Sequence, residues 1–206
     1  MATYIIVAVI AYLIGSINFS IIISKKMAGF DIREKGSGNA GTTNMLRSVG
    51  KKAAVITLIC DILKGVVAVL IAVLAGKIIK NLDNALLVQL AGIFVIVGHT
   101  FPIFFGFKGG KGIATTGGVI FAFHWQLGLI CAAVFLIITI ISKYVSLGSI
   151  CMVLIIPFIL YFNNPQDWKL VVVGCIFTAM AIWRHRANIV RLMNGTENKL
   201  GQKVKR

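Results

Sequence analysis

The chain has 206 residues, of which 58% are hydrophobic and only 13% are charged. Soluble domains carry about 25% charged residues, so the composition argues against a water-soluble enzyme and excludes disordered, collagenous and disulfide-rich chains. An integral membrane protein remains. Seven spans of roughly 20 residues would use about 140 positions, which leaves no room for a separate soluble domain.

The net charge is +15, from 21 Lys and Arg against 6 Asp and Glu. Such an excess favours nucleic acid, anionic lipid or an anionic substrate as the partner. Because the basic residues lie mostly between apolar stretches, lipid and an anionic substrate are expected and nucleic acid is not. The four cysteines lie inside apolar stretches without a C-x-x-C pair, which is typical of buried, unligated thiols.

Apolar segments follow one another along the chain. No basic residue precedes Lys25, so the first segment is predicted to be a retained span and not a cleaved signal peptide. Each segment is close to the roughly 17–25 residues that a crossing helix needs. The predicted spans cover 3–23, 53–75, 85–105, 146–162 and 168–183, separated by a polar stretch at 24–52, a connector at 76–84 and a Gly/Lys loop at 106–111, with a basic tail at 184–206.

The stretch 112–142 is long for one helix and short for two, and charge decides between them. Seven basic residues lie in 24–52 and seven in the tail, so both are expected in the cytoplasm. The loop 106–111 lies two spans after the stretch 24–52, so it is expected in the cytoplasm as well. An even number of crossings must then separate this loop from the tail, so 112–142 must divide into two spans with a turn near His124. The prediction is an all-α bundle of seven spans, N-terminus outside and C-terminus cytoplasmic, in which the short segment 112–123 packs against protein.

The first polar motif is Gly36-Ser-Gly-Asn-Ala-Gly-Thr-Thr-Asn-Met-Leu-Arg47. It satisfies the Gly-x-Gly-x-x-Gly pattern of dinucleotide sites, but that pattern needs a preceding strand, and an apolar span precedes it here. Glycines still let backbone N–H groups converge on an anion, and Arg47 is suited to grip a phosphate with two N–H groups. The alternative is a flexible linker. Short polar side chains accompany the glycines at Ser37, Asn39, Thr42, Thr43 and Asn44.

The second motif is Gly106-Phe-Lys-Gly-Gly-Lys-Gly112. It departs from the Walker A motif because Lys111 stands where that motif has its second glycine, so ATP hydrolysis is not predicted. A glycine-rich turn that carries Lys108 and Lys111 before a helix nevertheless favours phosphate binding. The alternative is a basic turn that only anchors the chain at the inner membrane surface.

The third motif is Trp183-Arg-His-Arg-Ala-Asn-Ile-Val-Arg191, followed by Asn194-Gly-Thr-Glu197. If the last helix continues, His185, Asn188 and Arg191 share part of one face. His185 is then suited to act as a base or to donate to phosphate, and Asn188 to donate to a hydroxyl. The alternative is a solvated basic tail on anionic lipid.

A few polar residues lie outside these motifs. Asp61 and Lys64 have a spacing that allows a pair inside a span, and such a pair is either functional or structural. His99 precedes Pro102, so it either lines the site or bonds a carbonyl freed by the proline, and Ser146 opens a span on the same side. No metal site is expected, because the sequence has no HExxH, no paired Cys and no carboxylate cluster.

The three motifs, in this order on a small basic membrane protein, resemble the bacterial acyl-phosphate-dependent glycerol-3-phosphate acyltransferases. The likeness covers nearly the whole chain, with no departure inside the motifs. The His-x-x-x-x-Asp pair of CoA-dependent glycerolipid acyltransferases is absent. The resemblance is carried by Gly36-Ser-Gly-Asn-Ala-Gly-Thr-Thr-Asn, by Gly98-His-Thr-Phe-Pro with Gly106-Phe-Lys-Gly-Gly-Lys-Gly, and by Arg184-His-Arg-Ala-Asn-Ile with Gly195-Thr-Glu.

The resemblance implies an enzyme of phospholipid biosynthesis that transfers a fatty acyl group from acyl phosphate to the 1-hydroxyl of glycerol 3-phosphate, giving lysophosphatidic acid and phosphate. It implies a multi-pass protein of the bacterial cytoplasmic membrane, one domain over residues 1–206, whose segments 36–52, 98–118 and 183–200 face the cytoplasm. The two substrates and membrane lipid are the expected partners, with no cofactor, no metal and no obligate protein partner.

The resemblance also implies roles for single residues. Ser37 and Arg47 would be catalytic, and His185 and Asn188 would serve activity, whereas His99 and Glu197 are expected to be structural. The predicted phosphate-binding residues are Gly38, Asn39, Thr42, Asn44, Lys108, Gly109, Gly110, Lys111, Gly112 and Ser146.

Acyl phosphate has a good leaving group, so the enzyme's main task is to hold two anions together. Their repulsion at about 5 Å is about 3 kcal/mol at an effective dielectric near 20, and Arg47, Lys108 and Lys111 are placed to offset it. Three routes stay open: His185 takes the hydroxyl proton, a substrate phosphate oxygen takes it, or Ser37 first forms an acyl-enzyme.

The alternative class is a small organophosphate transporter. Transporters place polar residues near the bilayer midplane and usually have repeated halves, whereas here the polar motifs gather at one face and no repeat is visible. The enzyme interpretation requires the three polar segments to converge on one pocket beneath the inner leaflet.

Overall fold

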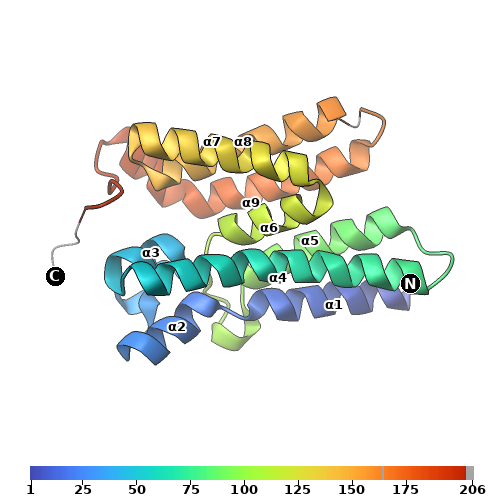
Figure 1. Ribbon diagram of the computed structural model, residues 1–206, viewed down its shortest axis with the longest axis horizontal. Coiled ribbons are helices and arrows are strands. Elements are labelled where there is room, and N and C mark those ends of the chain that lie inside the picture. Colours follow the sequence, from blue (N-terminus) through green and yellow to red (C-terminus); the bar gives the residue numbers. More distant parts are fainter. Residues whose placement is uncertain (164, 203–206) are drawn as a thin grey trace. The chain divides into compact units, whose positions relative to one another are not determined.

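The computed structural model describes residues 1–163 and 165–202. Within these ranges there are helices and turns and no strand, which confirms the all-α class. Six helical segments among the described residues are long and apolar enough to cross a membrane. The chain divides into two compact units, Met1–Phe123 and His124–Gln202. The helices, shown in Figure 1, are α1 (Ala2–Ser16), α2 (Phe19–Ala28), η1 (Ile32–Glu34), α3 (Thr42–Ser48), α4 (Lys51–Ile78), α5 (Asn84–Thr100), η2 (Ile103–Phe105), α6 (Ile113–Phe123), α7 (Trp125–Ser142), α8 (Val145–Asn163) and α9 (Trp168–Met193).

The first predicted span is interrupted near its C-terminal end. α1 stops at Ser16 and α2 starts at Phe19, and Asn18 between them has an extended backbone with φ −93° and ψ 96°. The Asn18 side chain caps α2, because its oxygen accepts from the Ile21 N–H at 3.3 Å. Asparagine favours such caps over helix interiors, so a single polar residue in an apolar stretch marks the break.

Within the first unit, α1 and α5 pack through glycines. Gly15 lies against the Val95 carbonyl and Gly98 against the Tyr12 carbonyl, so closely that neither position has room for a β-carbon. The Tyr12 hydroxyl donates to the Phe101 carbonyl at 2.9 Å. Small residues at helix contacts are the usual means of close packing in membranes, and here they fix the end of α5 from which the Gly/Lys loop departs.

The stretch 112–142 divides as predicted. α6 ends at Phe123, His124 has an extended backbone with φ −152° and ψ 96°, and α7 starts at Trp125. α6 has 11 residues, about 16 Å at 1.5 Å per residue, and it packs against α4 and α5 inside the first unit (Figure 1). The expectation that this short segment packs against protein is therefore confirmed.

The second unit consists of α7, α8 and α9, in which α8 packs against both neighbours. α9 continues to Met193, ten residues beyond the predicted end at 183. The first part of the predicted tail is therefore helical, and the condition that placed His185, Asn188 and Arg191 on one helix holds.

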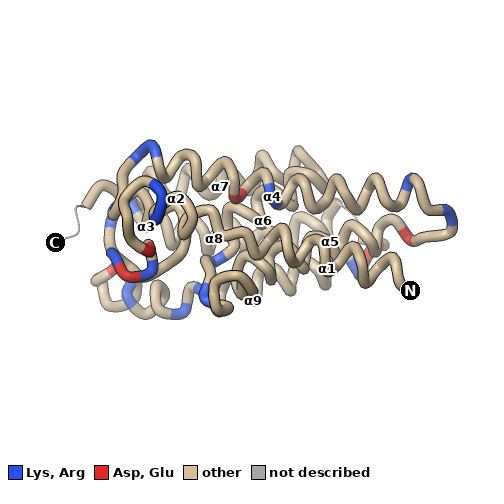
Figure 2. The backbone as a smooth tube through the Cα atoms, turned by 90° about the horizontal axis from the view of Figure 1, so that it is seen from below, with Lys and Arg blue, Asp and Glu red and all other residues tan. Residues whose placement is uncertain are grey.

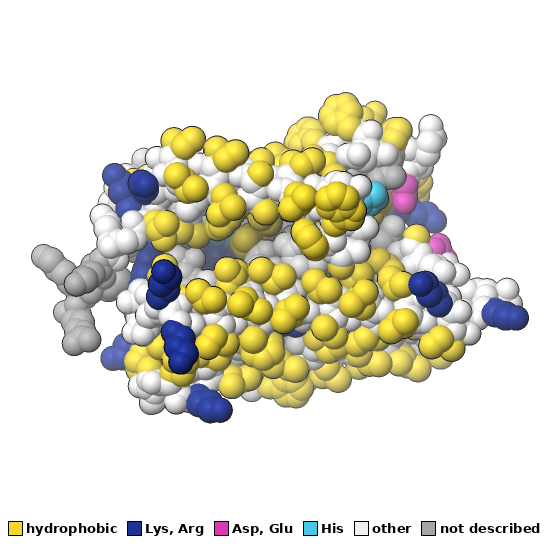
Figure 3. All heavy atoms as spheres, in the orientation of Figure 1, with side chains coloured by type: hydrophobic (Ala, Val, Ile, Leu, Met, Phe, Trp, Pro, Cys, Tyr) yellow, Lys and Arg dark blue, Asp and Glu magenta, His cyan; other side chains and the backbone are white. Residues whose placement is uncertain are grey.

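The two ends of the first unit differ in their polar residues. At one end the connector between α4 and α5 meets the start of α1, where the Asp83 N–H donates to the Tyr4 hydroxyl at 2.8 Å. The opposite end carries α2, α3 and a group of lysines and arginines (Figure 2). Hydrophobic side chains cover the exposed face of α4 between these ends (Figure 3), as expected of a helix that faces lipid.

The crossing of α6 over α4 gives a matched pair of variants. A methyl group added at Gly118 would overlap the Ile62 carbonyl, whereas one added at the adjacent Gly117 would meet no atom within 4 Å. We expect Gly118→Ala to lower the free energy of unfolding by about 1–3 kcal/mol through overpacking. Gly117→Ala should leave it equal or raise it, because alanine favours helix. Thermal unfolding in one detergent measures both, and equal stability of the two variants would contradict the close crossing.

Candidate active site

The first motif is a folded loop built around Asn44 on α3. The buried Asn44 amide nitrogen donates to the carbonyls of Ile32, Lys35 and Asn39 at 2.9–3.1 Å. Its side-chain oxygen accepts from the Ser37 N–H at 3.0 Å. These contacts make Asn44 the centre of the loop, and its predicted phosphate contact stays a prediction. The alternative of a flexible linker is disfavoured, because four loop residues are held by one side chain.

Ser37 lies on the outside of this loop. Its neighbours Gly36 and Gly38 have φ values of 59° and 71°, the left-handed region that glycine adopts at little cost. A β-carbon at Gly36 would also overlap the Asn44 side chain. Position 36 therefore requires glycine, because its φ is positive and a side chain there would have no room. The loop leaves Ser37 exposed to solvent. α3 then carries Arg47 in its last turn.

The second motif lies along the end of α5. The Gly109 N–H donates to the Thr100 carbonyl at 3.1 Å, and the Gly110 N–H donates to the His99 carbonyl at 3.2 Å. A side chain at Gly109 would overlap the His99 carbonyl, and one at Gly110 would overlap the His99 ring and the Ala40 carbonyl. The two amides satisfy carbonyls that a helix end leaves without partners, so these glycines serve close packing, and their predicted phosphate contact stays a prediction.

An ion pair lies beneath both loops in the first unit. Lys64 and Asp61 on α4 are 2.9 Å apart, with side chains 3% and 2% exposed. Lys64 Nζ also donates to the carbonyls of Gly15 and Ile17, at 3.1 and 2.9 Å. Asp61 Oδ1 lies 3.5 Å from His99 Nδ1. The sequence alone did not decide whether this pair has a functional or a structural role. These contacts favour a structural role, because they join the break after α1 to the end of α5.

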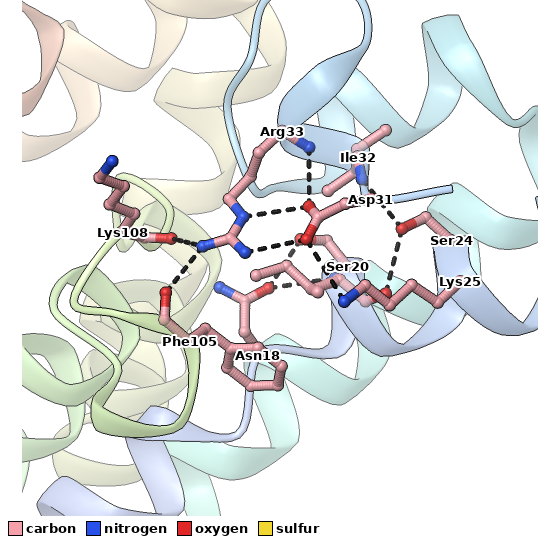
Figure 4. Close-up of polar contacts among 10 residues, drawn as sticks. Asn18, Ser20, Ser24, Lys25, Asp31, Ile32, Arg33, Phe105 and Lys108 are labelled. Carbon is pink, nitrogen blue, oxygen red and sulfur yellow. Dashed lines mark hydrogen bonds and ion pairs between the residues drawn. The ribbon is translucent and has the colours of Figure 1, made fainter. Parts of the chain in front are cut away.

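Arg33 joins the first motif to the second (Figure 4). Its Nη1 donates to the carbonyls of Phe105 and Lys108 at 2.7 and 3.2 Å. Its Nε and Nη2 donate to the Asp31 carboxylate at 3.0 and 2.8 Å. The Arg33 hydrogen bond holds the pKa of Asp31 below its ordinary value, although burial opposes that shift. The first two polar segments therefore meet, as predicted, within the first unit.

In the sequence, Arg33 stands out only as one of the seven basic residues of the stretch 24–52. Its acceptors are backbone carbonyls 72 and 75 residues away. A carbonyl is present at every position, so no residue pattern marks these acceptors. The nearest available signal was Asp31, two residues earlier, at a spacing that suits a local ion pair.

The third motif is assembled within the second unit around Glu197. The buried carboxylate accepts from the Ser146 hydroxyl at 3.1 Å, the Asn188 amide at 2.8 Å and Arg191 Nε at 2.7 Å. Burial opposes ionisation of Glu197, but the hydrogen bonds from Arg191 and Asn188 outweigh it and hold the pKa below its ordinary value. The Leu200 N–H donates to the turn between α7 and α8 at 2.6 Å, so the segment after α9 folds back onto its own unit.

His185 is buried one turn before Asn188 on α9. Its Nδ1 lies 2.7 Å from the Ala181 carbonyl. Because a carbonyl only accepts, Nδ1 carries the hydrogen in this contact and Nε2 is the basic nitrogen of the neutral ring. This is a tautomer that can accept a proton, and the role of His185 as the base stays a prediction.

The predicted site residues fall into three groups by exposure. Asn44, His99 and glycines 109, 110 and 112 are buried within the first unit, and Ser146, His185, Asn188 and Glu197 are buried within the second. The exposed group is Ser37, Gly38 and Lys108, and the half-buried group is Asn39, Thr42, Arg47 and Lys111.

Comparison with known proteins decides the family. The glycerol-3-phosphate acyltransferase family model matches residues 5–195. The glycerol-3-phosphate acyltransferase of Clostridioides difficile (strain 630) is 48% identical over 202 residues, which cover 98% of this chain and 97% of that protein. The chain belongs to the glycerol-3-phosphate acyltransferase family. The enzyme of Thermoanaerobacter sp. (strain X514) is 45% identical, over 97% of both chains.

Solved structures agree with this assignment. The crystal structure of PlsY (YgiH), an integral membrane glycerol 3-phosphate acyltransferase in its glycerol 3-phosphate form, is 39% identical, with a TM-score of 0.88 over 97% of this chain and 96% of that one. Its lysophosphatidic acid form is 38% identical with a TM-score of 0.85. This acyltransferase is therefore an integral multi-pass membrane enzyme, which confirms the predicted resemblance and sets the transporter alternative aside.

The Glu197 contacts predict a pH-dependent stability. A carboxyl whose pKa is lower in the folded chain stabilises the fold above its unfolded pKa, near 4.3, and stops doing so as the pH falls through the folded value. We expect Glu197→Gln to lower Tm by a few degrees at pH 7, and the difference in Tm from wild type to close as the pH falls through the lowered pKa of Glu197. The exposed Glu34, changed to Gln, is the control and should not shift Tm. A gap that persists in acid would contradict the assignment.

Proposed function

We propose that the chain acts as one membrane acyltransferase domain that transfers a fatty acyl group from acyl phosphate to the 1-hydroxyl of glycerol 3-phosphate, releasing lysophosphatidic acid and phosphate. The observation that carries the proposal is the meeting of the first two motifs at one end of the first unit. Ser37 lies on the loop and Arg47 on α3 in the first motif, and Lys108 and Lys111 lie in the second. The related PlsY structures are described in forms with glycerol 3-phosphate and lysophosphatidic acid, which match the acceptor and the product.

Two phosphate-bearing substrates suit this end of the unit electrostatically. At about 5 Å their charges repel by about 3 kcal/mol at an effective dielectric near 20, and Arg47, Lys108 and Lys111 offset that repulsion. The first amides of α6 have no acceptor inside the helix, and a helix N-terminus attracts anions. The phosphate of glycerol 3-phosphate is therefore assigned to the start of α6 and Lys111, and that of the acyl donor to the loop of Ser37 and Arg47.

In the reaction, the 1-hydroxyl oxygen bonds to the acyl carbonyl carbon, and the bond from that carbon to the phosphate oxygen breaks. The departing phosphate takes the electron pair, which Arg47 stabilises. The hydroxyl proton goes to His185 or to a phosphate oxygen. Because acyl phosphate is already activated, most of the rate enhancement comes from holding the two reactants in contact.

We also propose seven spans with the N-terminus outside and the C-terminus in the cytoplasm. In the first unit, the start of α1 shares an end with the connector before α5, and both motif loops lie at the other end. In the second unit, the turn between α7 and α8 shares an end with residue 200. Each motif-bearing end holds most of the basic residues of its unit, which the positive-inside rule places in the cytoplasm. The site would then face the cytoplasm at the bacterial plasma membrane.

The donor is tested directly with purified enzyme in detergent or liposomes. We expect hexadecanoyl phosphate and glycerol 3-phosphate to give lysophosphatidic acid and inorganic phosphate in equal amounts, measured by mass spectrometry and a phosphate assay. Hexadecanoyl-CoA and hexadecanoyl-acyl carrier protein should give no product. Product from a thioester alone would overturn the assignment of the donor, and no product from any donor would overturn the whole proposal.

The proton acceptor is tested with two histidine variants. If His185 is the base, His185→Ala should lower kcat by about 10²–10⁴-fold, the usual contribution of general base catalysis. His124 is exposed at the junction of α6 and α7, so His124→Ala is the control and should keep its turnover. A His185→Ala enzyme that keeps most of its turnover would assign the proton to a substrate phosphate. An acyl group trapped on Ser37 would establish the acyl-enzyme route instead.

A further inference from the structure

We infer that Asp31 and Arg33 form a positioning clamp that holds the turn at residues 105–108 against the loop of Ser37, and thereby sets the affinity of the enzyme for glycerol 3-phosphate. The inference rests on the proposed function for the identity of that ligand. It concerns two residues to which neither the motifs nor the resemblance gave a role.

The Arg33 guanidinium is committed to protein atoms. Nε and Nη2 donate to the two oxygens of Asp31, and Nη1 donates to the carbonyls of Phe105 and Lys108 (Figure 4). A guanidinium has five N–H groups, and these contacts occupy most of them. Arg33 is only 26% exposed and Asp31 only 9%. Arg33 is therefore built to hold backbone and not to bind a phosphate.

One side of the clamp is rigidly anchored. Arg33 lies in η1, whose first residue, Ile32, is fully buried. The Ile32 N–H donates to the Ser24 hydroxyl on α2 at 3.1 Å, and the Ile32 carbonyl accepts from Asn44 on α3 at 3.0 Å. Because Asn44 also organises the loop of Ser37, Arg33 and Ser37 are fixed to the same support.

The other side of the clamp is a strained turn. Gly106 and Phe107 both have positive φ, 66° and 60°, and an aromatic residue rarely adopts that region without support from its surroundings. The carbonyls that flank this turn, those of Phe105 and Lys108, are the two that Arg33 holds. The turn is followed by Gly109 and, two residues later, by Lys111, which like Lys108 is predicted to bind phosphate. Loss of the clamp should therefore let the turn relax and shift the lysines relative to Ser37.

Lysine cannot replace arginine in this geometry. The Asp31 carboxylate accepts two hydrogen bonds from Arg33, and this bidentate contact fixes the plane of the guanidinium. The N–H groups that reach the second motif lie in the same plane. An ammonium group is a point charge without this fork. Lys25, 3.6 Å from Asp31 and exposed, is too loosely held to take over. The clamp thus depends on shape as well as on charge.

The test compares Arg33→Lys, Arg33→Gln and Asp31→Asn with wild type. We expect each to raise the KM for glycerol 3-phosphate by about tenfold or more, with a smaller change in the KM for acyl phosphate and in Tm. Arg33→Lys should be nearly as impaired as Arg33→Gln, because the fork and not the charge is lost. Lys26 is an exposed basic residue at the same end of the unit, so Lys26→Gln is the matched control and should leave both KM values unchanged.

Hydrogen exchange supplies a readout that does not depend on activity. In Arg33→Lys, the amides of residues 105–110 should exchange faster than in wild type, and those of α1 should not change. Normal kinetics and normal exchange in Arg33→Lys would overturn the clamp, and so would equal increases in both KM values together with a large fall in Tm, which would indicate general destabilisation. Failure of the wild-type enzyme to use glycerol 3-phosphate would overturn the proposed function, whereas the exchange experiment would still decide whether Arg33 holds the turn.

Discussion

The first unit depends on one ammonium group in its interior. Burying the Lys64 charge costs several kcal/mol in a dry interior, and an ammonium has three N–H groups to satisfy. The carbonyls of Gly15 and Ile17 accept hydrogen bonds from Lys64 Nζ, and Asp61 forms an ion pair with it. These carbonyls stand where α1 ends, so they lack partners within the helix, and lipid offers none. The buried charge and the broken helix therefore stabilise each other, and neither would persist alone.

The same polar contacts support the loops of the site. Asp61 reaches His99 at the last turn of α5, and the His99 carbonyl accepts from the amide of Gly110. Gly110 in turn lies against the carbonyl of Ala40, in the loop of the first motif. A continuous series of buried contacts thus runs from the helix break to both glycine-rich loops. These buried polar contacts add to a small apolar cluster that includes Ile32, Ala40 and Met45 and against which Phe105 packs.

Hydropathy and charge were enough to predict most of the architecture, because a bilayer dictates helix length and the side on which lysine and arginine collect. The division of 112–142 at His124 followed from charge parity alone. The break at Asn18 was not predicted, and the extension of α9 to Met193 was considered only as a condition, since both depend on local capping and tertiary contacts that override the apolar pattern. The close packing of Gly109 and Gly110 against the end of α5 could not be predicted apart from phosphate binding, because both roles select glycine. The acceptors of Arg33 are backbone carbonyls and leave no mark in the sequence.

The placement of the acidic residues explains how a site for two anions coexists with a stable fold. Within residues 1–163 and 165–202, five of the six Asp and Glu side chains have a structural partner, and the exposed Glu34 is the exception. Asp83 and Asp167 cap α5 and α9, Asp61 pairs with Lys64, Asp31 with Arg33, and Glu197 with Arg191. A paired carboxylate projects little field beyond its partner, because opposite charges a few ångströms apart largely cancel at longer range. The acids thus shape the loops without opposing the substrates, and Arg47, Lys108 and Lys111 supply positive charge at the first two motifs.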